Sequence, residues 1–134
     1  MDQPRRTILA HLARTFAVQT ENLATEGLLF ILTNSRAARN ALSAVAFPEM
    51  ADVDRESLDL TFQSQVSGDD NSRPDLIGKD ADGREVLIVE AKFWAGLTEH
   101  QPVSYLHRLP RDGASCLLFV APQLRFETLW PELQ

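Results

Sequence analysis

The stretch PDLIGKDADGREVLIVEAK, residues 74–92, decides the fold of this chain. Two apolar runs, 75–79 and 84–93, flank the dipeptide Asp82-Gly83. An Asp-Gly pair between two such runs is the strongest short-range signal for a β-hairpin. The middle of the second run is apolar on both faces, which is typical of a strand inside a sheet and not of one at its edge.

The hairpin also predicts which side chains meet. With a two-residue turn, Ala81 pairs with Arg84, and continued pairing places Asp75 directly opposite Glu90. Opposed residues share a face of the sheet, with Cβ atoms roughly 4.5–5.5 Å apart. Lys92 lies two residues beyond Glu90 and therefore projects from the same face. The hairpin is predicted to gather two carboxylates and an ammonium, provided that the turn does not shift the register.

The rest of the chain alternates between helical and strand patterns. Apolar residues recur at helical spacing before residue 46, whereas alternation of apolar and polar residues begins at Leu58. This order predicts an α/β fold with one mixed sheet flanked by helices, in a single domain over 1–134. The predicted elements outside the hairpin are helices over about 4–17, 20–46 and 101–109, strands over 57–66 and 114–120, and a helical segment from 122.

Composition narrows the possible functions. The chain has 134 residues, and its 13 basic and 19 acidic residues give a net charge of -6, which argues against nucleic-acid binding through bulk positive charge. One cysteine excludes an intrachain disulfide and a cysteine zinc cluster. No apolar stretch approaches the roughly 18 residues that span a bilayer. We therefore expect no membrane partner and, without a signal segment, a cytoplasmic protein.

The predicted cluster indicates a particular chemistry. Two carboxylates side by side are unfavourable unless a cation lies between them, and all-oxygen ligands suit Mg²⁺, for which Mn²⁺ can substitute. A metal bound by Asp75 and Glu90 would activate water and stabilise charge on a phosphate, while Lys92 holds the attacking water or a phosphate oxygen. The alternative is a surface salt-bridge cluster of little energetic value. Glu90 ends the apolar run, which argues against its full exposure.

These residues resemble a known family. Pro74-Asp75, a gap of 14 residues and then Glu90-Ala91-Lys92 look like the signature of the PD-(D/E)xK nuclease superfamily. The resemblance implies the restriction-endonuclease-like fold, with an α-β-β-β-α-β core, and a metal-dependent nuclease acting on DNA. It further implies that Asp75 and Glu90 are metal ligands, that the Ala91 carbonyl adds a ligand, and that Lys92 is the catalytic lysine.

Two further features are similar to members of this superfamily. Many members place an acidic residue of the first core helix beside the metal, and here the candidates are Glu21 and Glu26, of which Glu26 is preferred. Gln101 and Tyr105 are similar to the Gln-xxx-Tyr motif of the RecB-like branch, which implies a catalytic role for Gln101 and a substrate-binding role for Tyr105. The alternatives are a solvated helix surface for Glu26, a helix cap for Gln101 and a half-buried aromatic ring for Tyr105.

The resemblance also bears on partners. It implies nucleic acid as the partner, with roles in phage defence or DNA repair. Because the net charge is negative, a homodimer or a partner protein is expected to supply positive surface for recognition. The alternative function is a catalytically silent domain of the same fold that binds nucleic acid or assembles a larger system. The net charge predicts weak binding to nucleic acid when Mg²⁺ is absent.

Overall fold

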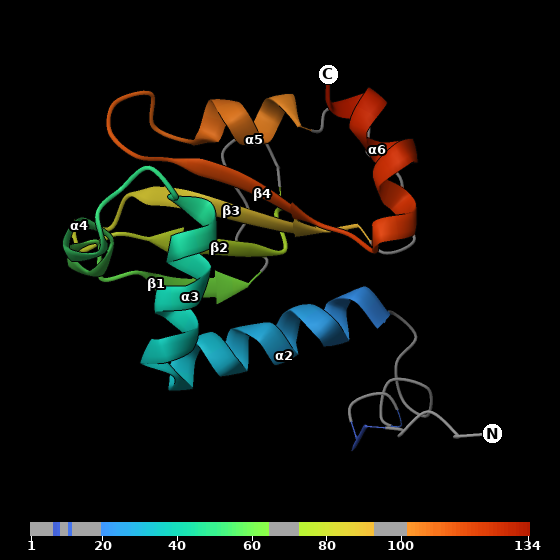
Figure 1. Cartoon of the computed structure of the whole chain (residues 1–134), viewed down its shortest axis with the longest axis horizontal. Coiled ribbons are helices and arrows are strands. Elements are labelled where there is room, and N and C mark those ends of the chain that lie inside the picture. The colour runs from blue at the N-terminus through green and yellow to red at the C-terminus, as the bar shows by residue number, and fades with distance from the viewer. Residues whose placement is uncertain (1–6, 9–10, 12–19, 65–72, 93–101) are drawn as a thin grey trace.

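Four strands form one mixed sheet in the order β1-β2-β3-β4 (Figure 1). The computed structural model describes residues 7–8, 11, 20–64, 73–92 and 102–134. β1 and β2 pair antiparallel, as do β2 and β3, whereas β4 runs parallel to β3. The prediction of an α/β fold with a mixed sheet is confirmed, and β3 is an internal strand as expected. The strands are β1 (Thr61–Ser64), β2 (Leu76–Lys79), β3 (Glu85–Ala91) and β4 (Cys116–Val120).

Helices cover both faces of this sheet (Figure 1). On one face, Leu32 and Ala46 pack with Val89 in the larger core cluster. On the other face, Tyr105 packs with Ile88. None of the helices in the described ranges is long and apolar enough to cross a membrane. The helical elements are α2 (Thr20–Asn34), α3 (Arg36–Ala46), α4 (Asp52–Ser57), α5 (Val103–Arg108), the 3-10 turn η1 (Gln123–Arg125) and α6 (Phe126–Leu133).

Two sequence predictions about these elements are wrong, and a third concerns residues that the structure does not describe. The single helix predicted over 20–46 is two helices, because Ser35 is extended (φ -128°, ψ 111°) and its Oγ accepts a hydrogen bond from the N–H of Ala38. Such a bond is the usual way that serine starts a helix. Helix α4 was not predicted. The apolar run within 114–120 predicts a buried strand, whereas β4 is half-buried along most of its length. The predicted helix over about 4–17 lies almost entirely outside the described residues.

The turn between β2 and β3 is longer than predicted. The N–H of Asp80 donates to the carbonyl of Arg84 (2.9 Å), so three residues, 81–83, form the loop. Gly83 takes φ +80°, the left-handed conformation that glycine adopts without a Cβ clash. The two-residue turn predicted from Asp82-Gly83 is therefore wrong. Without any other change, the longer loop would place every side chain of β3 on the face opposite to the predicted one.

A β-bulge in β3 cancels that shift. Lys79 lies opposite Glu85, but Gly78 lies opposite Leu87, so Val86 is an extra residue in β3. Val86 and Leu87 are both buried in the same core cluster, which strict alternation along a strand would not allow. Beyond the bulge the register is the predicted one. Leu76 faces Val89, and the residues just beyond them, Asp75 and Glu90, are brought together.

Candidate metal and catalytic site

The carboxylates of Asp75 and Glu90 each accept a hydrogen bond from a backbone N–H across the hairpin. The N–H of Asp75 donates to Oε2 of Glu90 (3.1 Å). In return, Oδ2 of Asp75 accepts a hydrogen bond from the N–H of Ala91 (2.7 Å). Each carboxylate thus satisfies a backbone donor on the opposite strand, at the point where the β2–β3 ladder ends. The predicted meeting of the two acidic residues is confirmed.

Lys92 completes the cluster. Its Nζ lies 3.1 Å from Oε1 of Glu90, and the two side chains are only 6% and 7% exposed. Residues of these types are almost never buried to this extent unless they are paired. The surface salt-bridge alternative is therefore wrong as regards exposure, since Glu90 and Lys92 are both buried. A buried ion pair of this kind adds little net stability in many proteins, because desolvation offsets the attraction.

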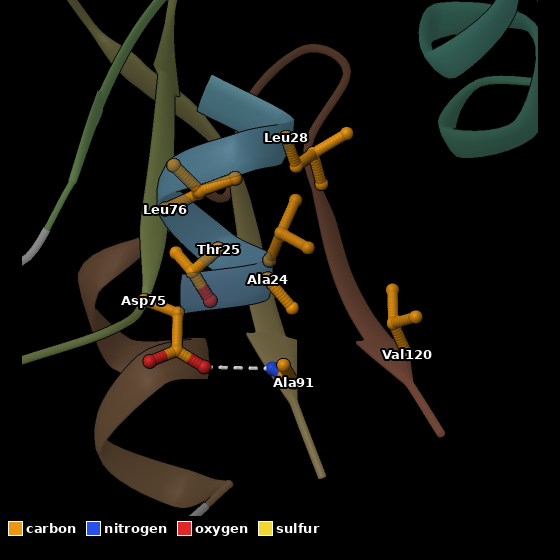
Figure 2. Close-up of a pocket in the computed structure, with 8 residues that line it drawn as sticks. Ala24, Thr25, Leu28, Asp75, Leu76, Ala91 and Val120 are labelled. Atoms are coloured by element: carbon orange, nitrogen blue, oxygen red, sulfur yellow. Dashed lines mark hydrogen bonds between the residues drawn. The ribbon is translucent and has the colours of Figure 1, made fainter. Parts of the chain in front are cut away.

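A small cavity lies beside Asp75, between helix α2 and the sheet (Figure 2). Its volume is about 50 Å³, which admits water but is far below the volume of a pocket for an organic ligand. Thr25 contributes from α2 and is 4% exposed, with its hydroxyl directed toward the side of the cavity where Asp75 lies (Figure 2). The cavity therefore has two polar side chains in an otherwise apolar lining, which consists of Ala24, Leu28, Leu76, Val89, Ala91 and Val120.

The carboxylates of Asp75 and Glu90 are suitable ligands for a hard divalent cation. Each carboxylate oxygen has two lone pairs, so one hydrogen bond does not exhaust its capacity to accept. Mg²⁺ is commonly bound by one or two carboxylates while it keeps several waters. Among the residues that the structure describes, no three histidine, cysteine, aspartate or glutamate side chains gather into a metal-binding group. The carboxylates of Asp75 and Glu90 supply oxygen donors at this place, and a contribution of the Ala91 carbonyl stays a prediction.

The structure does not bring Glu26 to the pair. Glu26 is exposed, whereas its neighbour Thr25 is buried and lines the cavity. The two residues of α2 just before Glu26, Ala24 and Thr25, line the cavity, whereas Glu26 does not. The solvated-surface alternative for Glu26 agrees with this exposure, and its role as a metal ligand stays a prediction.

The structure describes only one residue of the Gln-xxx-Tyr motif, Tyr105. Gln101 lies outside the described residues. Tyr105 is 2% exposed and packs against Ile88 and Leu109 on the α5 face of the sheet. At this burial its ring offers no surface for stacking on a nucleic-acid strand, so the structure places Tyr105 in the core and not at a substrate surface.

Two arginines, Arg39 and Arg108, have partners within the chain that tie elements of the fold together. Arg108 makes two hydrogen bonds to the carboxylate of Glu85, at 2.6 and 3.0 Å, which tie α5 to β3. Arg39 donates to the carbonyl of Leu32 (2.7 Å) across the α2–α3 break. These two guanidiniums hold elements of the fold together, whereas Arg36, Arg73 and Arg111 are exposed.

The pKa of Asp80, which lies at the turn end of the hairpin and not at the candidate site, is lowered from its ordinary value. Its Oδ1 accepts hydrogen bonds from the N–H groups of Arg84 (2.9 Å) and Asp82 (3.0 Å). The backbone hydrogen bond from Arg84 is the main cause that lowers the pKa of Asp80. Backbone donors favour the charged carboxylate, so this residue stabilises the turn and not the candidate site.

Two residues near the site were missed by sequence reasoning. Thr25 had a local signal, because it shares a helical stripe with Leu28 and Leu32, but a threonine on an apolar stripe is ordinary. Arg125 donates from Nη1 to the backbone carbonyl of Lys92 (3.2 Å). The two residues are 33 positions apart in the chain, and no local pattern connects them.

Comparisons with known proteins add no family to these observations. A scan against protein-family models, a search of curated proteins and a search of solved structures found no match to this chain.

Proposed function

We propose that this protein is a nuclease that depends on Mg²⁺ or Mn²⁺ and hydrolyses phosphodiester bonds, most naturally in DNA. The observation that carries the proposal is the cluster of Asp75, Glu90 and Lys92. Lys92 and Glu90 form a buried ion pair at 3.1 Å, and Asp75 is fixed to the same strand end through Ala91. An ammonium and two carboxylates at the end of an internal strand are the groups that this hydrolysis needs.

The order of elements supports membership of the PD-(D/E)xK superfamily. Helices α2 and α3 precede three antiparallel strands, and a helix, α5, leads to a strand parallel to β3. This succession agrees with the α-β-β-β-α-β core of the restriction-endonuclease-like fold. The additional short helix α4 and the terminal η1–α6 segment lie outside that core.

The proposed reaction is attack of a water oxygen on phosphorus, with cleavage of the bond to the leaving oxygen, which takes up a proton. The products are a phosphate monoester and a free hydroxyl group. A divalent cation supplies Lewis acidity when it is bound by Asp75 and Glu90. Lys92 donates hydrogen bonds to the attacking water or to a non-bridging oxygen, and its charge opposes the negative charge that develops on the phosphate.

The acidic residue that we propose from the first core helix is Glu21, the second candidate of the sequence. Glu21 precedes Thr25 by four residues, a spacing that aligns two positions on one stripe of an ideal helix. The side chain of Glu21 itself lies outside the described part of the structure. Position 26 is on the exposed side. Replacing Glu21 by Gln should weaken Mn²⁺ binding, whereas Glu26→Gln should leave it unchanged.

A cleavage assay with a matched lysine control tests the proposed function. The chain has two lysines, Lys92 at the site and Lys79 at the end of β2 nearer the turn. Lys92→Ala should lower cleavage by at least about 100-fold, and Lys79→Ala should not. Linear, circular, single-stranded and structured DNA and RNA would be supplied with Mg²⁺ or Mn²⁺, and excess chelator should stop cleavage. Cleavage by the purified Lys92→Ala variant, or in chelator, would overturn the proposal.

One observation favours a second function, a silent domain of the same fold. Both oxygens of the Glu90 carboxylate already have partners within the chain, Lys92 on one and the Asp75 N–H on the other. Such pairing is sufficient to stabilise the strand ends with no metal present. Calorimetry with Mn²⁺ separates the two functions, because a silent domain should give no binding heat that Asp75→Ala removes.

A further inference from the structure

The peptide of Lys92 is held from two sides by one short segment of the chain. Its N–H donates to the carbonyl of Val120 (2.8 Å), the last residue of β4. Its carbonyl accepts a hydrogen bond from Nη1 of Arg125 (3.2 Å), the last residue of η1. The segment from Val120 to Arg125 thus contacts both polar groups of the Lys92 backbone.

The path of this segment explains how Arg125 reaches back. After β4 the chain is extended at Pro122 (φ -60°, ψ 146°) and then turns through η1, with the N–H of Arg125 donating to the carbonyl of Pro122 (2.9 Å). Helix α6 follows at once and is anchored by Leu129, which is 4% exposed. The half-buried Arg125 is therefore fixed by elements on both of its sides, and its guanidinium is not a freely moving surface charge.

We propose that Arg125 is a positioning residue for Lys92, an inference that rests on the proposed nuclease function. A hydrogen bond from a charged donor to a carbonyl is stronger than a neutral one. By fixing the Lys92 carbonyl, Arg125 limits rotation of the peptide that carries this side chain, and so keeps Nζ beside Glu90. Lys92 follows the last residue of β3, where the sheet no longer holds both sides of the backbone, so a second anchor has the largest effect here.

The roles of positioning residue and substrate contact lead to different kinetics. A residue that holds Lys92 in place acts on the chemical step, so its loss lowers kcat and leaves KM nearly unchanged. A residue that binds phosphate directly raises KM when it is removed. Arg125→Met removes the donor and the charge, Arg125→Lys retains one donor and the charge, and Arg111→Met is the control for loss of an exposed arginine.

The two lysines provide a readout that does not depend on activity. Acetylation by a lysine reagent, mapped by mass spectrometry, gives the rate at Lys92 relative to Lys79 in the same molecule. In the native protein Lys92 should react slowly, because it is buried and paired. Arg125→Met should raise the Lys92 to Lys79 ratio by about tenfold, Arg125→Lys should restore most of the protection, and Arg111→Met should change nothing. Circular dichroism would establish that each variant is folded.

The outcomes separate this inference from the proposed function. It is supported by a raised labelling ratio together with a kcat lowered by about tenfold at constant KM. An unchanged ratio in folded Arg125→Met overturns it whatever the activity, as does a rise in KM alone. Absence of cleavage by the native protein on every nucleic acid overturns the nuclease function, while the labelling ratio still decides whether Arg125 fixes Lys92.

Discussion

The N–H of Asp75 donates a hydrogen bond to the carboxylate of Glu90, and the carboxylate of Asp75 accepts one from the N–H of Ala91, the residue after Glu90. The two acidic side chains are therefore structural partners of the hairpin as well as candidate metal ligands. Any variant of either residue changes both properties, and the substitutions must be chosen to separate them.

Two substitutions of Asp75, by alanine and by asparagine, separate its contribution to stability from its contribution to metal binding. Asp75→Ala leaves the N–H of Ala91 without its acceptor and should lower the free energy of unfolding by about 1–3 kcal/mol. Asp75→Asn retains a carbonyl oxygen that can accept this bond, so its loss of stability should be smaller. Both should abolish Mn²⁺ binding. Urea unfolding in chelator and Mn²⁺ calorimetry measure the two effects, and equal destabilisation by both variants would contradict the role of the Ala91 bond.

The Glu90–Lys92 pair should behave as a coupled unit. Lys92→Met leaves the Glu90 charge buried without its partner and should lower the free energy of unfolding by about 3–5 kcal/mol. Glu90→Gln should also be destabilising, for the same reason applied to Lys92. The double variant buries neither charge, so its loss should be well below the sum of the single losses. A double-mutant cycle in chelator measures the coupling, and additive losses would show that the two charges do not interact.

Two glycines should respond in opposite ways to the same substitution. Gly83 has φ +80° and no atom within 4 Å of an added Cβ, so Gly83→Ala costs backbone strain alone, about 1–2 kcal/mol. Gly27 lies inside α2, also with open space around it, and Gly27→Ala should stabilise the protein by up to about 1 kcal/mol. Thermal unfolding of both variants tests the prediction. A neutral Gly83→Ala would contradict the described turn.

Asp80 predicts a dependence of stability on pH. Because the folded state lowers the pKa of Asp80, the charged carboxylate contributes stability that is present above the ordinary aspartate pKa of about 4 and is lost as the pH falls through the lower folded value. Asp80→Asn lacks this contribution. The difference in unfolding free energy between the native protein and Asp80→Asn should therefore be largest near neutral pH and should shrink below about pH 4. A constant difference from pH 7 to pH 3 would contradict it.

The sequence predicted the meeting of Asp75 and Glu90 for a reason that was only half right. Asp82-Gly83 marked the turn correctly, but the side chain of Asp80 accepts two backbone hydrogen bonds and favours a three-residue loop. The compensating bulge at Val86 had no signal, because a run that is apolar on both faces gives no alternation from which a slipped residue can be read. The register at the site is the result of both features.

Other differences have equally local causes. The break at Ser35 was readable, since serine is a strong helix N-cap, but the apolar stripe continued through it and favoured one long helix. Burial of Tyr105 depends on α5 packing against Ile88, and the contact of Arg125 with Lys92 depends on the path after β4. Neither of these contacts between distant segments produces a periodic pattern of residues from which it could be predicted.

The loop over 81–83 and the bulge at Val86 also decide where this hairpin can change in length during evolution. Loss of one loop residue, or of Val86, can be absorbed at that place, because the pairs beyond it keep their partners. Loss of one residue from 87–89 would instead place Glu90 on the side of the sheet that Val89 now occupies, and would disrupt both the core and the acidic pair. Related chains are therefore expected to vary in length at the turn and to keep the spacing from Leu87 to Glu90.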